Sequence, residues 1–226
     1  MSIAAIIPAA GFSKRMRGVS KMYLKLGRLP LLGLTLKNIS KCKHIGSMVI
    51  VVNEKDIRKA KTIIAKYNIK KVKAVVAGGK TRQQSVANGF AAVNGSAKLV
   101  LIHDGARPFV DNAVIDRAIS AAKKYGAAIA GVPLKPTLKR LSRDGFVWST
   151  LRRDEIWEIQ TPQVFKKELF EEAINSSTNS ATDDSALIEA LGYKVKVVLG
   201  SYKNIKVTTP EDLVFAEALS GKGKKE

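Results

Sequence analysis

Short apolar segments of strand length alternate along this chain with longer segments of helical periodicity. The apolar, β-branched segments are residues 3–7, 48–52, 72–77, 99–102 and 127–132. Helices are predicted between them, at residues 31–41, 54–67, 81–93 and 111–125. Strands this uniformly apolar are typical of a parallel sheet, so the pattern predicts an α/β fold, mostly parallel, with helices on both faces. Ligands of such sheets bind at the carboxyl ends of the strands.

The pattern changes after Pro133. Residues 134–158 hold two β-rich segments around Asp144-Gly145, a strong turn signal, and predict a long two-stranded arm. A lone hairpin is marginal in water, so its apolar residues must pack on a second protomer or fold back on their own domain. Beyond it we expect helices at about 166–174 and 183–191, a strand at 195–199, and a helix from Pro210 capped by Thr209. The length predicts a single domain, 1–226, that carries the arm at about 134–158.

The composition excludes several classes of protein. It is 46% hydrophobic and 26% charged, which is ordinary for a globular protein. The single Cys42 excludes an internal disulfide and a multi-cysteine metal site. No apolar segment approaches the ~20 residues of a membrane span, and the N-terminal MSIAAIIPAAG lacks the basic flank of a signal peptide. We therefore expect a cytoplasmic location and no membrane partner.

The chain is strongly basic, with a net charge of +20. Residues 1–82 contain 19 basic residues against only Glu54 and Asp56, a net charge of +17. Such a field attracts a polyanion, which could be nucleic acid, an acidic membrane or a highly charged phosphate substrate. The alternative is that these lysines form an ordinary solvated surface with no specific partner.

The loop after the first predicted strand, PAAGFSKRM, combines small residues with cations. Ala9, Ala10 and Gly11 let backbone N–H groups approach a ligand closely. Four cations follow within eight residues: Lys14, Arg15, Arg17 and Lys21. This combination suits a triphosphate, although a glycine turn before a basic helix would look similar. The dinucleotide pattern GxGxxG is absent.

A second loop, AGGKTRQQS, follows the third predicted strand. It is no Walker loop, because Ala74 occupies the position of the first required glycine. Instead, Gly79 and the glycine before it allow the backbone to read a base edge, and Thr81 caps the next helix. Arg82 and Ser85 are expected one turn apart on the exposed face of that helix.

The segment IHDGARP ends the fourth predicted strand. A lone acid in this position, Asp104, can hold Mg²⁺ together with substrate phosphates; the alternative is a turn cap. His103 is expected to be buried and hydrogen-bonded. Lys206 lies on a β-rich segment just before the Thr209 cap and can point at the same sheet edge, unless it is simply an exposed strand lysine.

The motifs PAAGFSKRM, SKMYL, GGKTRQQSV, HDGARP, TPQ, TDDSA and NIKVTTPEDL, in this order and spacing, resemble the 2-C-methyl-D-erythritol 4-phosphate cytidylyltransferase family of the non-mevalonate isoprenoid pathway. The resemblance runs from Ile3 to about Leu213. It implies a Rossmann-like nucleotidyltransferase fold whose arm forms a homodimer. It also implies the reaction of CTP with methylerythritol phosphate to give the CDP-alcohol and pyrophosphate, with Mg²⁺.

The resemblance assigns roles to individual residues. The catalytic cations are Arg15, Lys21 and Lys206. Nucleotide-binding positions are Pro8, Ala9, Ala10, Gly11, Phe12, Gly79, Arg82, Ser85, Asp104 and Gly105, with Asp104 also the metal ligand. The polyol phosphate is assigned to Arg107, Thr161, Thr137 and Arg153, the last two acting from the arm in the partner subunit. Lys80 and Pro136 depart from the family pattern, in which both positions are usually acidic.

Two other functions are compatible with parts of the sequence. One is a ribitol-5-phosphate or other sugar-phosphate nucleotidyltransferase, which shares these motifs. The other is a nucleic-acid-binding protein that uses the basic N-terminal half. The chain lacks a recognition-helix signature and is only 6% aromatic, so we expect no nucleic-acid partner.

Overall fold

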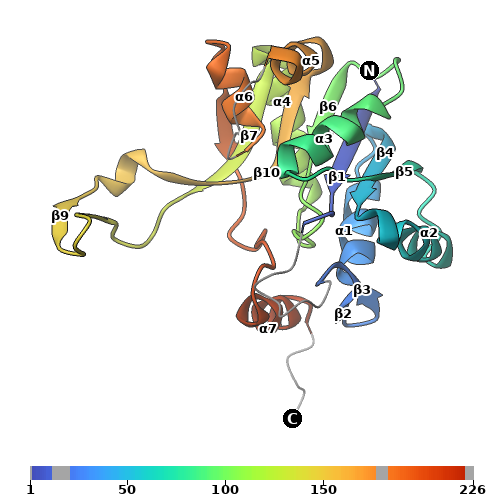
Figure 1. Cartoon of the computed structure of the whole chain (residues 1–226), viewed down its shortest axis with the longest axis horizontal. Coiled ribbons are helices and arrows are strands. Elements are labelled where there is room, and N and C mark those ends of the chain that lie inside the picture. The colour runs from blue at the N-terminus through green and yellow to red at the C-terminus, as the bar shows by residue number, and fades with distance from the viewer. Residues whose placement is uncertain (1, 12–20, 177–182, 222–226) are drawn as a thin grey trace.

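The computed structural model describes residues 2–11, 21–176 and 183–221. Within these residues, seven strands form one sheet in the order β11-β7-β10-β6-β1-β4-β5 (Figure 1). Their bounds are β1 Ile3–Pro8, β4 Ile45–Val52, β5 Val72–Ala77, β6 Leu99–Ile102, β7 Ala127–Pro133, β10 Trp157–Lys166 and β11 Lys196–Leu199. Neighbouring strands are parallel except where β10 pairs with β6 and β7. The sheet is therefore mostly parallel, as the alternating pattern predicts.

Helices cover both faces of the sheet because its strands are apolar on both sides. One face packs against α1 Leu31–Ser40, α2 Ile57–Lys66 and α4 Asn112–Tyr125, and Ala216 of α7 Pro210–Leu219 belongs to the same hydrophobic core. The other packs against α3 Arg82–Ala91, α5 Lys167–Ser176 and α6 Ser185–Ala190. In β1, Ile3 and Ile7 face the first group and Ile6 the second. No helix in the described part of the chain is long and apolar enough to cross a bilayer.

Strand β10 is the main departure from the predicted fold. The sequence pattern assigns residues up to 158 to the arm and predicts no sheet strand at 157–166. Instead β10 runs antiparallel between β6 and β7, and Phe165 stacks on Phe170 of α5 with 5.1 Å between ring centroids. Pro162 hides this strand from sequence reasoning, because proline is unusual in a central strand. It is accommodated where the pairing with β7 shifts between Ile159 and Gln163.

The arm extends from two adjacent strands of the sheet, β7 and β10, and projects from the body (Figure 1). Its root is closed by a hydrogen bond from the N–H of Leu134 to the carbonyl of Ile156, at 3.1 Å. Tyr202 braces it: its hydroxyl donates to the carbonyl of Pro133 at 2.6 Å, and the ammonium of Lys135 lies 3.8 Å from its ring centroid. Paired strands are shorter than the two segments of about ten residues that the sequence indicates: β8 spans Lys139–Leu141 and β9 Val147–Thr150.

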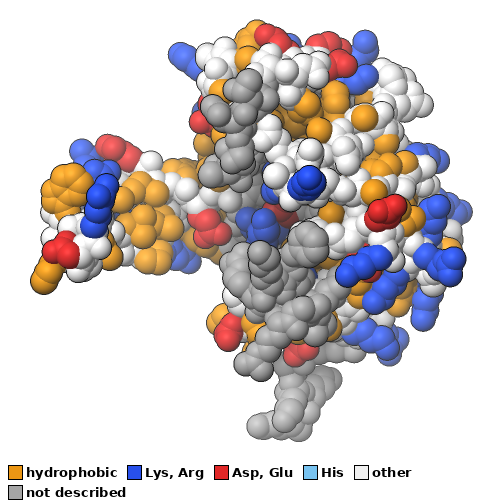
Figure 2. Space-filling model, in the orientation of Figure 1, with side chains coloured by type: hydrophobic (Ala, Val, Ile, Leu, Met, Phe, Trp, Pro, Cys, Tyr) orange, Lys and Arg blue, Asp and Glu red, His pale blue; other side chains and the backbone are white. Residues whose placement is uncertain are grey.

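The tip of the arm is turned by glycine and coated with apolar side chains. Gly145 has φ +90°, which a residue with a Cβ rarely adopts, so the predicted Asp144-Gly145 turn is confirmed. Phe146 and Trp148 are each 72% exposed, and Figure 2 shows apolar side chains along the arm. The arm does not fold back on its own domain, which leaves this apolar surface open in the single chain.

Candidate active site

Two loops at the carboxyl ends of β1 and β5 meet side by side. The N–H of Ala9 donates to Val51 at 2.7 Å, and the N–H of Gly78 donates to Val52 at 2.8 Å. A Cβ on Gly78 would lie 2.4 Å from the Cβ of Ala10, so only glycine allows this approach. The sequence-predicted small residues therefore bring two backbone segments together at one edge of the sheet.

Helix α3 begins at the second loop, as predicted. The Thr81 hydroxyl accepts from the N–H of Gln84 at 3.0 Å and caps the helix. The Ser85 hydroxyl donates to the carbonyl of Thr81 at 2.9 Å and accepts from the N–H of Gly79 at 3.1 Å. Ser85 is buried, so the expectation that it lies on the exposed face is wrong: its hydroxyl shapes the glycine loop from behind.

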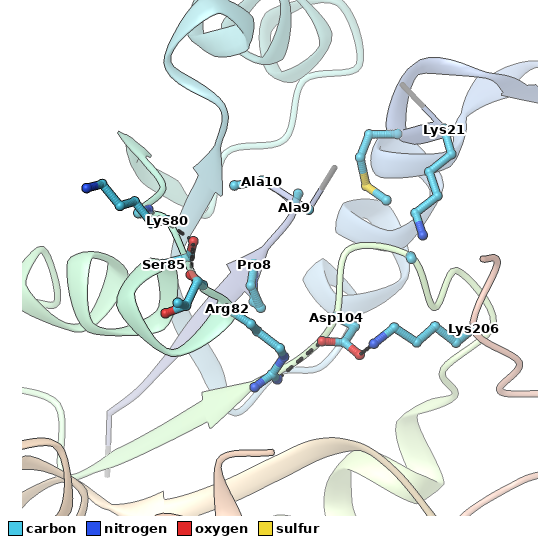
Figure 3. Close-up of a pocket in the computed structure, with 14 residues that line it drawn as sticks. Pro8, Ala9, Ala10, Lys21, Lys80, Arg82, Ser85, Asp104 and Lys206 are labelled. Atoms are coloured by element: carbon cyan, nitrogen blue, oxygen red, sulfur yellow. Dashed lines mark hydrogen bonds and ion pairs between the residues drawn. The ribbon is translucent and has the colours of Figure 1, made fainter. Parts of the chain in front are cut away.

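A pocket of about 280 Å³ opens between these loops and the end of β6 (Figure 3). Its lining residues are Pro8, Ala9, Ala10, Gly11, Lys21, Met22, Gly79, Lys80, Thr81, Arg82, Ser85, Asp104, Ala106 and Lys206. Small residues form one wall, and Lys21, Arg82 and Lys206 supply positive charge. The shape and charge suit a nucleotide whose phosphates face the cations.

Asp104 lies among cations, next to this pocket. Its Oδ2 is 2.7 Å from Nζ of Lys206, and its Oδ1 is 3.3 Å from a guanidinium nitrogen of Arg82. Figure 3 shows the two cations approaching the carboxylate from opposite sides. Burial alone would raise the pKa of Asp104, but Lys206 and Arg82 hold it well below its usual range. The carboxylate is therefore ionised at any physiological pH.

Arg82 also binds Asp184, a contact that the sequence did not reveal. The guanidinium makes two hydrogen bonds to the Asp184 carboxylate, at 2.9 and 2.7 Å. Burial raises the pKa of Asp184, whereas Arg82 opposes this shift. The TDDSA motif places this acid directly before α6, but only the fold brings it to Arg82. Arg82 thus spans the distance between Asp104 and Asp184.

A second, larger pocket of about 830 Å³ shares Arg82, Asp104 and Lys206 with the first. Arg107 and Thr161 line it, together with Gln163, Asp183 and residues of α6 and β11. One terminal nitrogen of Arg107 donates to the carbonyl of Asn204 at 2.7 Å, and its buried Nε has no hydrogen-bond partner. Two adjoining pockets that share cations could hold two phosphorylated substrates in contact.

Most predicted site residues within the described chain lie at these pockets. Gly105 is an exception: it packs behind the first pocket, where a Cβ would lie 3.0 Å from the Cβ of Ala9. Lys206 reaches the site from an irregular segment rather than from the expected strand. Thr137 and Arg153 are exposed on the arm and line neither pocket of their own chain. Phe12 and Arg15 fall outside the described residues.

Some lining residues were not singled out by sequence reasoning. Met22 and Ala106 lie inside the motifs SKMYL and HDGARP, but they are apolar wall residues that carry no chemical signal of their own. Thr81 was predicted only as a cap. His103 is fully buried and hydrogen-bonded, as expected. No grouping of three acidic, histidine or cysteine residues that could hold a metal occurs in the part of the chain that the structure describes.

A mostly parallel sheet with a glycine loop and clustered cations at its carboxyl edge defines an α/β nucleotide-binding enzyme of the nucleotidyltransferase class. The model of the 2-C-methyl-D-erythritol 4-phosphate cytidylyltransferase family matches residues 3–222. The chain belongs to this family.

Individual relatives agree over nearly the whole length. The chain is 45% identical to the 2-C-methyl-D-erythritol 4-phosphate cytidylyltransferase of Desulforamulus reducens, covering 96% of this chain and 95% of that one. It is 43% identical to that of Dehalococcoides mccartyi, covering 98% and 97%. The crystal structure of 4-diphosphocytidyl-2C-methyl-D-erythritol synthase from Anaerococcus prevotii superposes with a TM-score of 0.87 at 37% identity, covering 97% of this chain and 96% of that chain.

Proposed function

We propose that the chain transfers a cytidylyl group from CTP to 2-C-methyl-D-erythritol 4-phosphate, giving 4-diphosphocytidyl-2-C-methyl-D-erythritol and pyrophosphate. Family membership along residues 3–222 supports the substrate pair. The observation that carries the chemistry is the pair of adjoining pockets that share Arg82, Asp104 and Lys206. The first pocket takes the nucleotide and the second the polyol phosphate. The relatives reported above are named for methylerythritol phosphate, so they do not favour the ribitol-phosphate alternative.

The reaction needs electrostatic stabilisation rather than a covalent nucleophile. A phosphate oxygen of the polyol substrate attacks the α-phosphorus of CTP in line. The new P–O bond forms as the bond between the α-phosphorus and pyrophosphate breaks, and negative charge builds on the oxygens around the α-phosphorus. Lys21 and Lys206 line the first pocket and stabilise this charge. The attacking phosphate is ionised at neutral pH, so the site requires no strong general base.

Asp104 fits the role of a magnesium ligand. It offers an ionised carboxylate in the wall shared by both pockets, and Mg²⁺ is commonly held by one or two carboxylates together with substrate phosphates. When bound there, the ion neutralises phosphate charge. Lys206, whose side chain is 39% exposed, can turn from Asp104 to a phosphate, while Asp104 keeps Arg82 and Arg107 nearby.

The arm supports a homodimer in which each subunit completes the other's site. Its apolar residues, Phe146 and Trp148 among them, are exposed in the single chain and would be covered by a partner. Thr137 and Arg153 lie on the same arm, away from their own pockets, and would contact the polyol phosphate of the partner. We further propose a cytoplasmic enzyme without a nucleic-acid partner, in which the basic charge attracts phosphorylated substrates.

Pyrophosphate release tests the proposed reaction directly. The purified chain is assayed with Mg²⁺, each of the four ribonucleoside triphosphates, and methylerythritol phosphate or ribitol-5-phosphate. CTP with methylerythritol phosphate should give the highest kcat/KM. Equal or faster turnover with UTP or with ribitol-5-phosphate would reject the assignment. Omission of the polyol phosphate is the control for simple CTP hydrolysis.

A further inference from the structure

His103 follows β6 directly and is completely buried beside the site. Its Nε2 is 2.9 Å from the carbonyl oxygen of Arg107, and its Nδ1 is 3.1 Å from the hydroxyl of Thr161. The same hydroxyl accepts from the backbone N–H of Asp104 at 3.1 Å. The imidazole itself does not line either pocket, so the proposed reaction gives it no direct role.

The chemistry of these groups fixes where each proton lies. The Arg107 carbonyl can only accept, so Nε2 carries hydrogen and donates to it. The ring is completely buried and neither of its hydrogen-bond partners is an acid, so it is neutral and has a single N–H. Nδ1 is therefore an acceptor, and the Thr161 hydroxyl donates to it. The hydroxyl oxygen of Thr161 is then free to accept from the backbone N–H of Asp104.

These hydrogen bonds hold both ends of one tight turn. The N–H of Arg107 donates to the carbonyl of Asp104 at 3.0 Å, which closes the turn. The side chains at its two ends, the Asp104 carboxylate and the Arg107 guanidinium, both line the second pocket. Thr161 lies where the pairing of β10 with β7 is interrupted, and such interruptions commonly redirect a side chain.

We propose that His103 is a positioning residue that acts through Thr161. By accepting the hydrogen bond of the Thr161 hydroxyl at Nδ1, it leaves the hydroxyl oxygen as a fixed acceptor, which anchors the backbone N–H of Asp104. Thr161 then has no proton to donate to a substrate phosphate, although it lines the second pocket. Its contribution is to hold Asp104 in place. The kinetic test of this inference rests on the proposed function; the spectroscopic test does not.

The position of the imidazole proton can be measured without any substrate. The chain contains two histidines, so protein labelled with ¹⁵N-histidine gives two sets of long-range ¹H–¹⁵N correlations, and a His44→Gln variant assigns them. At neutral pH, His103 should carry its proton on Nε2 alone. A proton on Nδ1, or on both nitrogens, would overturn the proposal. This result is decisive even if the proposed reaction fails.

Kinetics then test whether His103 and Thr161 act as one unit. His103→Gln retains a side-chain donor but loses the ring acceptor, and Thr161→Val loses the hydroxyl. Each should lower kcat/KM by about 10- to 100-fold, the usual effect of losing a supporting hydrogen bond at a site. The double variant should be no worse than the poorer single variant, because both remove the same chain of hydrogen bonds. Thr161→Ser, which keeps the hydroxyl, should restore most activity.

The opposite outcome is equally clear. If Thr161 donated its proton to the polyol phosphate, Thr161→Val would raise KM for that substrate by the same factor with or without His103→Gln, and the two losses would multiply. Ile119→Val is the matched control for a loss of stability. Ile119 is buried in α4 and lines neither pocket, so this variant should unfold earlier but retain its kcat.

Discussion

Nζ of Lys206 lies 2.7 Å from Oδ2 of Asp104, joining the segment before α7 to the end of β6. The backbone supports this contact, because the N–H of Val207 donates to the carbonyl of Ala106 at 2.9 Å. The lysine side chain is 39% exposed and the aspartate side chain only 9%. The lysine is therefore the solvent-exposed charge of the pair, and the aspartate is the buried one.

Replacing Lys206 should affect the reaction far more than the fold. Lys206→Met is expected to lower kcat by about 100-fold, the scale of losing one donor that stabilises transition-state charge. The free energy of unfolding should change little, because Asp104 keeps Arg82 at 3.3 Å. Lys203→Met, on the same segment but lining neither pocket of the site, is the control. Similar kcat losses in both variants would contradict the role of Lys206.

Gly78 should be irreplaceable for nucleotide binding. A Cβ there would lie 2.4 Å from Ala10 and 2.9 Å from the Ser85 hydroxyl, so Gly78→Ala must push the two loops apart. We expect KM for CTP to rise by about tenfold or more, since misplacement by about 1 Å can cost 100-fold. Gly95→Ala is the control, because a Cβ at Gly95 would meet nothing within 4 Å. An unchanged KM for Gly78→Ala would show that the glycine loop does not bind the nucleotide.

Because His103 is buried, the free energy of unfolding should fall in mild acid. Burial lowers the pKa of His103 from 6.5 to about 4, and the nearby Asp104 and Arg107 shift it in opposite directions. As the pH falls below 6.5, the unfolded chain takes up a proton that the folded chain does not, so stability is lost until about pH 4. The full loss is about 3 kcal/mol.

Urea unfolding between pH 7 and pH 4, in metal-free buffer, measures this loss. His103→Gln lacks the titration, so the difference between the two pH curves isolates His103 from the carboxylates. The variant should start less stable and lose less on acidification. Parallel curves would mean that the imidazole takes up its proton as readily in the folded chain as in the unfolded one.

The arm should work between subunits. Lys206→Met and Arg153→Ala chains are co-expressed with different tags, and doubly tagged dimers are purified. The site on the Arg153→Ala chain keeps its own Lys206 and receives Arg153 from its partner, so one site of two is complete and about half of wild-type activity is expected. Each variant alone should be inactive. If Arg153 served its own chain, every site in the mixed dimer would lack one cation and no activity would return.

Sequence reasoning recovered the features that local chemistry determines. Strands β5 and β6 match their predicted bounds, and Thr209 caps α7 as its hydroxyl and the Asp212 carboxylate bond each other's backbone N–H groups. The motifs also predicted Asp104 and Lys206 as site residues, and both line the two pockets. These features depend on residues that are close together in the sequence, so the sequence alone is enough to predict them.

Features that depend on distant contacts were missed. Asp184 is joined to the site only through Arg82, which is far away in the sequence and donates to its carboxylate. Ser85 was expected on an exposed face because helical periodicity does not reveal that a glycine loop covers it. Strand β10 was hidden by Pro162 and by its continuity with the arm. In each case the position of the residue or strand is determined by contacts with an element that is distant in the sequence.

The arm is a direct extension of the central sheet rather than a separate loop attached to it. Its strands enter the domain as β7 and β10, and β10 lies beside β6, the strand that leads into the loop with Asp104. The backbone of the arm thus continues without a break into the strand next to β6. The length of the arm can therefore change only in steps of two residues per strand. Two added residues in each strand lengthen the arm and keep every side chain on its original face. One added residue turns all side chains beyond it to the opposite face.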